Sequence, residues 1–328
     1  MVPIIHQLAL NENHSPPLPG VRRAIEDGAD RVHLTQDALA GGLTAELARR
    51  LGVAAERVVA GAGSGALIQQ FLNAHAGSGA RVVHSWPSFE LYPLLIGNAG
   101  GTPVAVPGEP QDLRALAAAV TSETRVVLLC NPNNPTGEVL GHAEVAEFVD
   151  LLPPDVLVLI DEAYREFASP GELADGLALA ATDDRVAVVR TFSKSHGLLG
   201  LRVGYLVASE PVAAALRPTL PFFRVGTLAQ AAALAALDAE ARMREQCAEV
   251  ATERDRVRAG LLDLGWDVPP SGGNFLWLRL GPQNQSFVDH LAAAGVAVRE
   301  IAGAGVRVST GTPEANDLVL ALAKEFAA

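Results

Sequence analysis

The sequence alternates short β-branched runs with stretches rich in alanine and leucine. Seven such runs occur before residue 210, at 57–60, 81–84, 103–106, 125–129, 156–160, 186–190 and 202–207. Continuous apolar strands separated by helices are typical of a mainly parallel sheet that is covered on both faces. The chain has 328 residues, more than the roughly 250–300 at which a single core stops growing, so we expect a large α/β domain and a smaller one.

The pattern changes beyond Pro218. A long alanine-rich helical region, bent or interrupted, is expected over 228–264, and Thr312 with Pro313 is typical of the start of a last helix. Strand-like segments lie between them, at 274–280, 296–301 and 306–309. The expected organisation is a segment 1–35 that joins the small domain, a large domain 36–217 and a small α+β domain 218–328.

Composition excludes several classes of protein. The net charge is −12 and no run of lysines or arginines occurs, which argues against a nucleic-acid partner. Cys130 and Cys247 lack the spacing of a metal site or a disulfide framework. No stretch reaches the roughly 18 apolar residues of a membrane span, and the first residues lack a basic leader. We therefore expect a cytoplasmic protein that acts on small molecules and binds no metal.

In an open α/β sheet, ligands bind beyond the carboxyl ends of the strands. The first informative end is "VVAGAGSGALIQQF", where a strand runs through glycines into a helix that offers free N–H groups to a phosphate. The stretch also fits the dinucleotide fingerprint G-x-G-x-x-A, but no acidic residue follows at the next strand end. A glycine loop alone is equally consistent with a tight turn.

Two further strand ends carry polar groups. "CNPNNPTG" places three asparagines in a loop stiffened by two prolines. Asp161 follows five apolar residues, and a carboxylate there is costly unless it faces a cation or hydrogen-bond donors. Asp161 as the cap of a following helix is the alternative. Tyr164 lies near Asp161 if the chain turns helically.

The fourth end, "TFSKSHGLLGLRVGY", sets Lys194 between two serines, with Arg202 opening the next strand. Lysines are usually exposed. One at a buried strand end, close to another cation, can have its pKa lowered enough to attack an aldehyde. Pyridoxal phosphate binds a lysine through its aldehyde, a carboxylate through its ring nitrogen, and a helix N-terminus with an arginine through its phosphate. The sequence offers all of these groups in Lys194, Asp161, the glycine loop and Arg202.

These residues resemble those of the fold-type-I aminotransferases of class I/II, in the branch of the histidinol-phosphate and aromatic (phenylalanine) aminotransferases. The resemblance extends over nearly the whole chain in the family's order, through "GAGSGALIQQ", "SWPSFELY", "CNPNNPTG", "IDEAYREF", "TFSKSHGLLGLRVGY", "PPSGGNFLWL" and "VRVSTGTPEAND". It implies the pyridoxal-phosphate transferase fold, with a mainly parallel seven-stranded sheet in the large domain. It also implies a homodimer.

The resemblance implies roles for individual residues. Lys194 would bind the cofactor aldehyde as a Schiff base and then shuttle a proton, with Asp161 on the ring nitrogen; Lys194, Asp161 and Tyr164 form the expected catalytic set. The other cofactor contacts would be Asn134 and Tyr164 at the phenolic oxygen, Phe89 on the ring face, and Ser64, Gly65, Ser193 and Arg202 at the phosphate. Substrate contacts would be Arg307, which grips the carboxylate in a bidentate fork, and Asn274.

The sequence departs from the family at several positions. Thr35 stands where a tyrosine usually reaches the cofactor phosphate of the neighbouring subunit, and the segment before "LALNENHSPPLPG" is shorter than in relatives. Gly272 and Gly273 replace a bulkier pair. His196 follows the lysine where an aromatic is common, and we interpret it as a spacer more readily than as a general base. These changes predict a reshaped, more open substrate pocket.

We therefore expect a pyridoxal-phosphate-dependent aminotransferase that moves an amino group between an amino acid and a 2-oxo acid. An aromatic or apolar substrate is favoured over a histidinol-phosphate-like one because the usual tyrosine stretch is missing. A decarboxylase or lyase of the same fold is the main alternative. An oxidoreductase that binds a dinucleotide, or a non-catalytic cofactor-binding protein, explains fewer of the residues.

Overall fold

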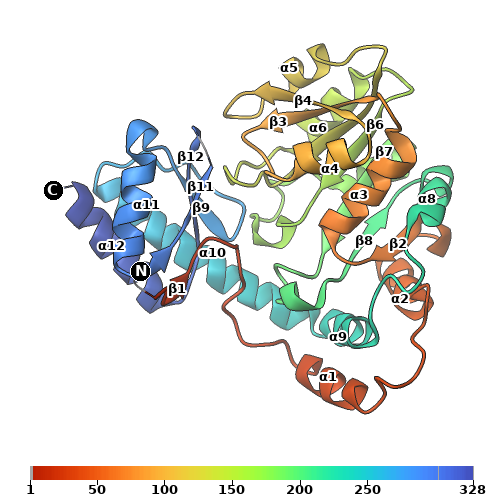
Figure 1. The fold of residues 1–328 in the computed structure, drawn as a ribbon, viewed down its shortest axis with the longest axis horizontal. Helices are drawn as coiled ribbons and strands as arrows, with labels where there is room; N and C mark the ends of the chain where they lie inside the picture. Colours follow the sequence, from red (N-terminus) through yellow and green to blue (C-terminus); the bar gives the residue numbers. More distant parts are fainter. Residues whose placement is uncertain (1–2, 302, 328) are drawn as a thin grey trace.

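The computed structural model describes residues 3–301 and 303–327, and its centre is a seven-stranded sheet (Figure 1). The strands lie in the order β2-β8-β7-β6-β5-β3-β4. Strand β8 is antiparallel to both neighbours and every other pair is parallel. The bounds are β2 (Val58–Gly61), β3 (Arg81–Trp86), β4 (Thr102–Pro107), β5 (Thr124–Cys130), β6 (Leu157–Asp161), β7 (Val186–Thr191) and β8 (Gly204–Val207). The expected mainly parallel seven-stranded sheet is confirmed.

Helices cover both faces of this sheet because the strands are apolar on both sides. In β5, Val126 and Leu128 pack on one face while Val127 and Leu129 pack on the other. The first face is covered by α3 (Ser64–His75), α4 (Tyr92–Asn98) and α8 (Glu210–Leu216). The opposite face is covered by α2 (Gly41–Leu51), α5 (Leu113–Ala118), α6 (His142–Asp150), α7 (Gly176–Thr182) and α9 (Thr227–Asp238).

Strand β1 and most of the C-terminal elements form a smaller layered unit at the left of Figure 1. Its three-stranded antiparallel sheet has the order β11-β12-β9, and β10 pairs with β1 near the N-terminus. The bounds are β1 (His6–Gln7), β9 (Phe275–Leu278), β10 (Val296–Ala297), β11 (Arg299–Ile301) and β12 (Gly305–Ser309), with α10 (Glu240–Asp263), α11 (Asn284–Ala293) and α12 (Pro313–Ala327) packed against them. The single strand expected over 296–301 is therefore two short strands in different sheets.

The expected helical region 228–264 is interrupted at Ala239, between α9 and α10. Helix α9 packs against α2 and against α1 (Val21–Ala29), and α10 runs from there to the smaller unit (Figure 1). The domain boundary near residue 218 stays a prediction. Among the described residues, no helix combines the length and the apolar character needed to cross a membrane.

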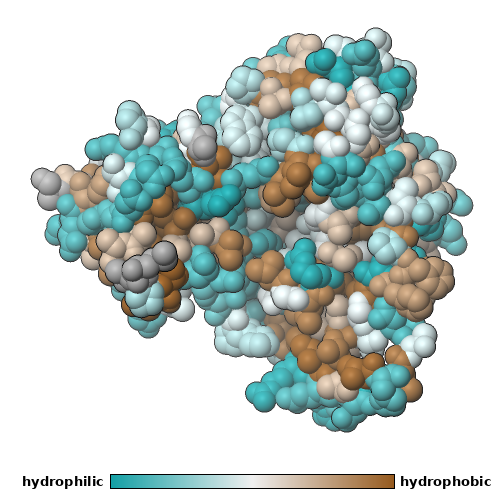
Figure 2. All heavy atoms as spheres, in the orientation of Figure 1, coloured by the Kyte–Doolittle hydropathy of each residue, from teal (hydrophilic) through white to brown (hydrophobic). Residues whose placement is uncertain are grey.

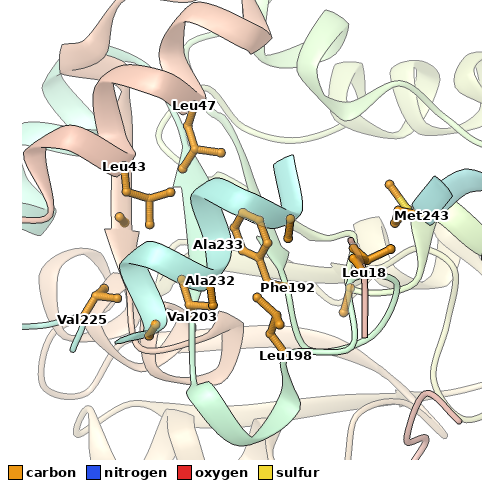
Figure 3. Close-up of a cluster of buried hydrophobic side chains, with 14 of the residues drawn as sticks. Leu18, Leu43, Leu47, Phe192, Leu198, Val203, Val225, Ala232, Ala233 and Met243 are labelled. Carbon is orange, nitrogen blue, oxygen red and sulfur yellow. The ribbon is translucent and has the colours of Figure 1, made fainter. Parts of the chain in front are cut away.

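A buried cluster under α9 anchors the segment that follows β7. Phe192 has no exposed surface and lies among Ala233 of α9, Leu47 of α2 and Leu198, all with their side chains turned toward one another (Figure 3). Burying a phenylalanine side chain stabilises a fold by about 1.5–3 kcal/mol. Because Phe192 stands two residues before Lys194, this packing fixes where the lysine leaves the sheet.

Candidate active site

Polar residues from four strand ends meet at one edge of the large sheet. The strand pairing places Cys130 opposite Asp161, Asp161 opposite Val189, and Thr191 opposite Gly204, so β5, β6 and β7 end at a common level. A cavity of about 420 Å³ opens there. Ten of the expected site residues line it, namely Ser64, Gly65, Phe89, Asn134, Asp161, Tyr164, Ser193, Lys194, Arg202 and Arg307. The structure therefore brings these ten residues to one pocket.

Lys194 is one of the residues that line this pocket. Its Nζ donates hydrogen bonds to the backbone oxygens of Leu10 and Asn11, each at 3.1 Å. Burial, together with the positive charges of Arg307 and Arg202, lowers the pKa of the Lys194 ammonium to about 7, while Glu12 opposes this shift. A large fraction of the amine is therefore neutral near pH 7, which is the form that attacks an aldehyde.

This shifted pKa predicts how the apoprotein takes up an aldehyde cofactor. The rate constant should rise about tenfold per pH unit below pH 7 and level off above it, because protonated amine is lost as the pH passes the pKa. Stopped-flow absorbance after mixing with pyridoxal phosphate would measure this, with Nα-acetyllysine as the control for an unshifted amine. A rate constant that still rises between pH 9 and 10 would contradict the prediction.

Asp161 ends β6 and is almost fully buried, with 5% of its surface exposed. One carboxylate oxygen accepts a hydrogen bond from the hydroxyl of Tyr92 at 3.2 Å, and the other accepts one from the backbone N–H of Ala163 at 3.2 Å. Burial raises the pKa of Asp161 to about 6, although both hydrogen bonds oppose the rise. Among the described side chains none forms an ion pair with this carboxylate, so the site is suited to a cationic group on a ligand.

The start of α3 and the loop after β7 form a cradle for an anion. The first N–H groups of a helix have no partner within the helix and carry its positive dipole end. Arg202 lies beside them and donates one hydrogen bond to Ser193 Oγ at 3.1 Å. Gly63 has φ 90°, and a Cβ on it would lie 2.5 Å from Arg202 Nη2. Glycine at this position lets the guanidinium lie against the first turn of α3, where a larger side chain would displace it.

The opposite wall comes from the smaller unit and from two large-domain loops. Arg307 of β12 is 7% exposed and donates to Asn134 Oδ1 and to the backbone oxygen of Ala9. Its Nε has no hydrogen-bond partner in the described structure. Tyr164 accepts a hydrogen bond at its hydroxyl from Asn11, and Phe89 lies edge-on to Tyr92. This wall thus offers a buried guanidinium, an amide and a phenol.

Asn274, Thr35 and His196, which the sequence singled out, do not line the pocket. Asn274 lines a neighbouring cavity, and its Nδ2 donates to the backbone oxygens of Asn11 and Glu12 at 3.3 Å. Thr35 is exposed on the loop before α2. His196 packs on Phe192, with ring centroids 4.7 Å apart, and burial lowers its pKa to about 4. A neutral, buried His196 fits the interpretation as a spacer.

Sequence reasoning missed two residues of this site. Tyr92 starts α4 and reaches Asp161 across 69 positions of sequence, and Asn11 reaches Tyr164 across 153. The tyrosine three positions after Phe89, on the first turn of a helix, was a local signal for the first. No local pattern distinguishes Asn11 from the neighbouring amide residues Gln7 and Asn13.

The donor set fits pyridoxal phosphate. A phosphate would be held by the start of α3, Ser193 and Arg202, and a protonated ring nitrogen would supply the cation that the buried Asp161 carboxylate favours. Lys194 offers a primary amine of lowered pKa between these two groups. The close approach of Arg202 to Gly63 keeps the guanidinium at the helix start, where it would neutralise the charge of a phosphate.

Comparison with known proteins gives concordant matches of three kinds. The family model described as aminotransferase class I and II matches residues 3–321. An aromatic amino acid aminotransferase of Thermobifida fusca is 51% identical over 98% of this chain and 90% of that protein, and one of Streptomyces avermitilis is 46% identical over 99% and 91%. The crystal structure of histidinol-phosphate aminotransferase from Sinorhizobium meliloti with pyridoxal-5'-phosphate superposes with a TM-score of 0.92 at 30% identity, covering 99% of this chain and 91% of that one.

Proposed function

Since this chain belongs to the class I and II aminotransferases and moves amino groups with pyridoxal phosphate, we propose that its substrates are aromatic amino acids and their 2-oxo acids. The observation that carries this proposal is the composition of the pocket. A buried arginine, Arg307, lines it together with the apolar side chains of Leu10, Phe89, Leu91 and Leu199. The Arg307 guanidinium suits a substrate carboxylate, and the apolar side chains suit an aromatic ring. The names of the two similar bacterial proteins support the same substrate class.

We assign the cofactor contacts as follows. The N–H groups of α3 at Ser64 and Gly65, the Ser193 hydroxyl and Arg202 hold the phosphate, and Asp161 holds the ring nitrogen. Asn134 and Tyr164 hold the phenolic oxygen, and Phe89 covers one face of the ring. When bound, pyridoxal phosphate supplies an electron sink for the negative charge that develops at the substrate Cα.

The chain's own residues bind and orient the substrate and move its proton. Arg307 binds the carboxylate through two parallel N–H donors, which orients the substrate for reaction at Cα. Lys194 Nζ moves the proton at Cα, and a pKa of about 7 suits a group that must both accept and release a proton at neutral pH. Asp161 stays ionised through its hydrogen bonds from Tyr92 and the backbone, so that it can stabilise a positive charge.

Titration of the purified holoenzyme with single amino acids tests the substrate class. Phenylalanine, tyrosine and tryptophan should convert the visible band of the cofactor to the near-ultraviolet band of its amine form, each with release of the matching 2-oxo acid. Histidinol phosphate, titrated alongside, should convert it at least tenfold less efficiently. Conversion by histidinol phosphate alone would overturn the aromatic assignment, and carbon dioxide release without oxo acid would point to a decarboxylase.

Two further expectations belong to this proposal. Exposed apolar side chains lie on the segment before α2 and on that before α9, at Val32, Leu34, Leu39, Phe222 and Phe223. Figure 2 shows apolar surface gathered around α1 and α9. Large exposed apolar patches mark interaction surfaces, so we assign this one to a second copy of the chain, to be tested by light scattering. A cytoplasmic location stays a prediction from the sequence.

A further inference from the structure

Residues 9–13, which we call the strap, cross the pocket above Lys194. The backbone oxygens of Leu10 and Asn11 accept hydrogen bonds from the Lys194 amine, and the backbone oxygen of Ala9 accepts one from Arg307. At its far end, Asn13 donates to the backbone oxygens of Lys194 and Ser195, at 3.0 and 3.2 Å. The strap is therefore fixed on both sides of the pocket by direct hydrogen bonds.

Asn11 is the most buried residue of the strap, with 1% of its surface exposed. Its φ is 52°, a left-handed conformation that asparagine, aspartate and glycine adopt more readily than other residues. Asn11 Nδ2 donates to the hydroxyl oxygen of Tyr164 at 2.9 Å. The residue thus combines a special backbone conformation with a side-chain contact to a proposed catalytic group.

Ser309 of β12 determines which way the Asn11 amide points. Ser309 Oγ accepts the backbone N–H of Asn11 at 2.9 Å and donates its own proton to Asn11 Oδ1 at 2.9 Å. If the Asn11 amide were rotated by 180°, its Nδ2 would face Ser309 Oγ in place of Oδ1. The Ser309 hydroxyl would then face two donors, and its own buried proton would lose its acceptor, which is unfavourable. The amide nitrogen is therefore the group that faces Tyr164.

An amide nitrogen donates and does not accept, so the Tyr164 oxygen must be the acceptor in this contact. The phenol keeps its own proton for another acceptor. We propose that Asn11 is a positioning residue that directs the Tyr164 proton into the pocket, toward the phenolic oxygen of the cofactor. This inference rests on the proposed function, because it needs the cofactor contact assigned to Tyr164. Burial raises the pKa of Tyr164 to about 12, which keeps that proton in place at neutral pH.

The visible band of the bound cofactor reports this hydrogen bond through its pH titration. A donor at the phenolic oxygen stabilises negative charge there and makes the cofactor nitrogen attached to Lys194 less basic. Tyr164→Phe removes the donor and should raise the titration midpoint by about one pH unit. Asn11→Asp turns the donor into an acceptor that draws the Tyr164 proton away, so it should raise the midpoint by a similar amount.

Two neutral variants separate this effect from added charge. Asn11→Gly keeps the left-handed backbone and removes the amide, and Ser309→Ala frees the amide to rotate. Each should raise the midpoint by less than Asn11→Asp but measurably above the wild-type value. Asn13→Ala is the matched control, because it removes a strap contact without touching Tyr164, and its midpoint should not move.

The outcomes distinguish the positioning role of Asn11 from the cofactor contact of Tyr164. A raised midpoint in Tyr164→Phe, with wild-type midpoints in all the Asn11 and Ser309 variants, would overturn the positioning role alone. No shift in Tyr164→Phe would overturn the cofactor contact of Tyr164 itself. An equal shift in Asn13→Ala would mean that strap position, and not the amide, sets the midpoint. Thermal unfolding of each holoenzyme variant measures whether it is folded.

Discussion

Replacing Lys194 with alanine should lower the turnover number by about 10⁴-fold or more, because one amine both binds the cofactor aldehyde and moves the substrate proton. The phosphate, ring and carboxylate contacts do not involve this side chain, so the variant should still bind pyridoxal phosphate without forming the band of the lysine-bound cofactor. Steady-state kinetics and the absorbance spectrum measure the two effects separately.

The sequence offers a strict control for this experiment, because Lys194 and Lys324 are its only lysines. Lys324 is exposed in the last turn of α12, so Lys324→Ala should keep both the band and the activity. Borohydride reduction of the holoenzyme followed by peptide mapping should label the fragment with residue 194 alone. Lys194→Arg keeps a positive charge but no nucleophilic amine and should be as inactive as the alanine variant. Normal turnover in Lys194→Ala would refute the assignment.

Replacing Asp161 with asparagine should lower kcat on the order of 10²–10³-fold and change the apparent affinity for the amino acid far less. The carboxylate stabilises the positive ring nitrogen most strongly when negative charge develops at the substrate Cα, so its removal acts on the transition state. Asparagine keeps the shape and the hydrogen bond from Tyr92 but carries no charge. Equal losses in kcat and in substrate affinity would contradict this role.

Two further experiments test whether Asp161 acts through its charge. Tyr92→Phe removes one hydrogen bond to the carboxylate and leaves its charge, so its loss in kcat should be roughly tenfold at most. A cofactor analogue methylated on the ring nitrogen carries a fixed positive charge, and Asp161→Ala leaves space for the methyl group. That analogue should restore part of the lost rate in Asp161→Ala, and the absence of any rescue would count against the electrostatic role.

Two of the residues that the sequence revealed, Asp161 and Lys194, lie at or just beyond the end of an apolar strand. Asp161 and Lys194 could be placed at a common edge because the carboxyl ends of parallel strands meet there, and the pocket contains both. Arg202 was expected to open the next strand, but β8 begins at Gly204. Arg202 instead adopts a left-handed conformation with φ 53°, which turns its side chain to the start of α3.

The missed contacts depend on tertiary structure. Asn11 meets Tyr164 only because β1 pairs with β10, which draws the N-terminal segment onto the smaller unit and across the pocket. Asn274 was expected at the substrate, and the structure has it holding the strap through backbone oxygens, a contact that no spacing in the sequence encodes. The exact position of the break at Ala239 could not be predicted, because neither glycine nor proline occurs between residues 227 and 259 to mark it.

The reversed direction of β8 has a consequence for how this chemistry could be transplanted. Gly204 pairs with both Thr191 and Gly61, so β8 begins at the edge where β2 and β7 end. A parallel β8 would need a crossover of a dozen or more residues back to the far edge before it could start. Its first residue would then lie roughly 10 Å away, at about 3.3 Å per strand residue. As built, residues 191–205 form one contiguous segment that carries both the amine of Lys194 and the guanidinium of Arg202, the two groups proposed to bind the cofactor aldehyde and phosphate, so a single segment exchange between related scaffolds would transfer both.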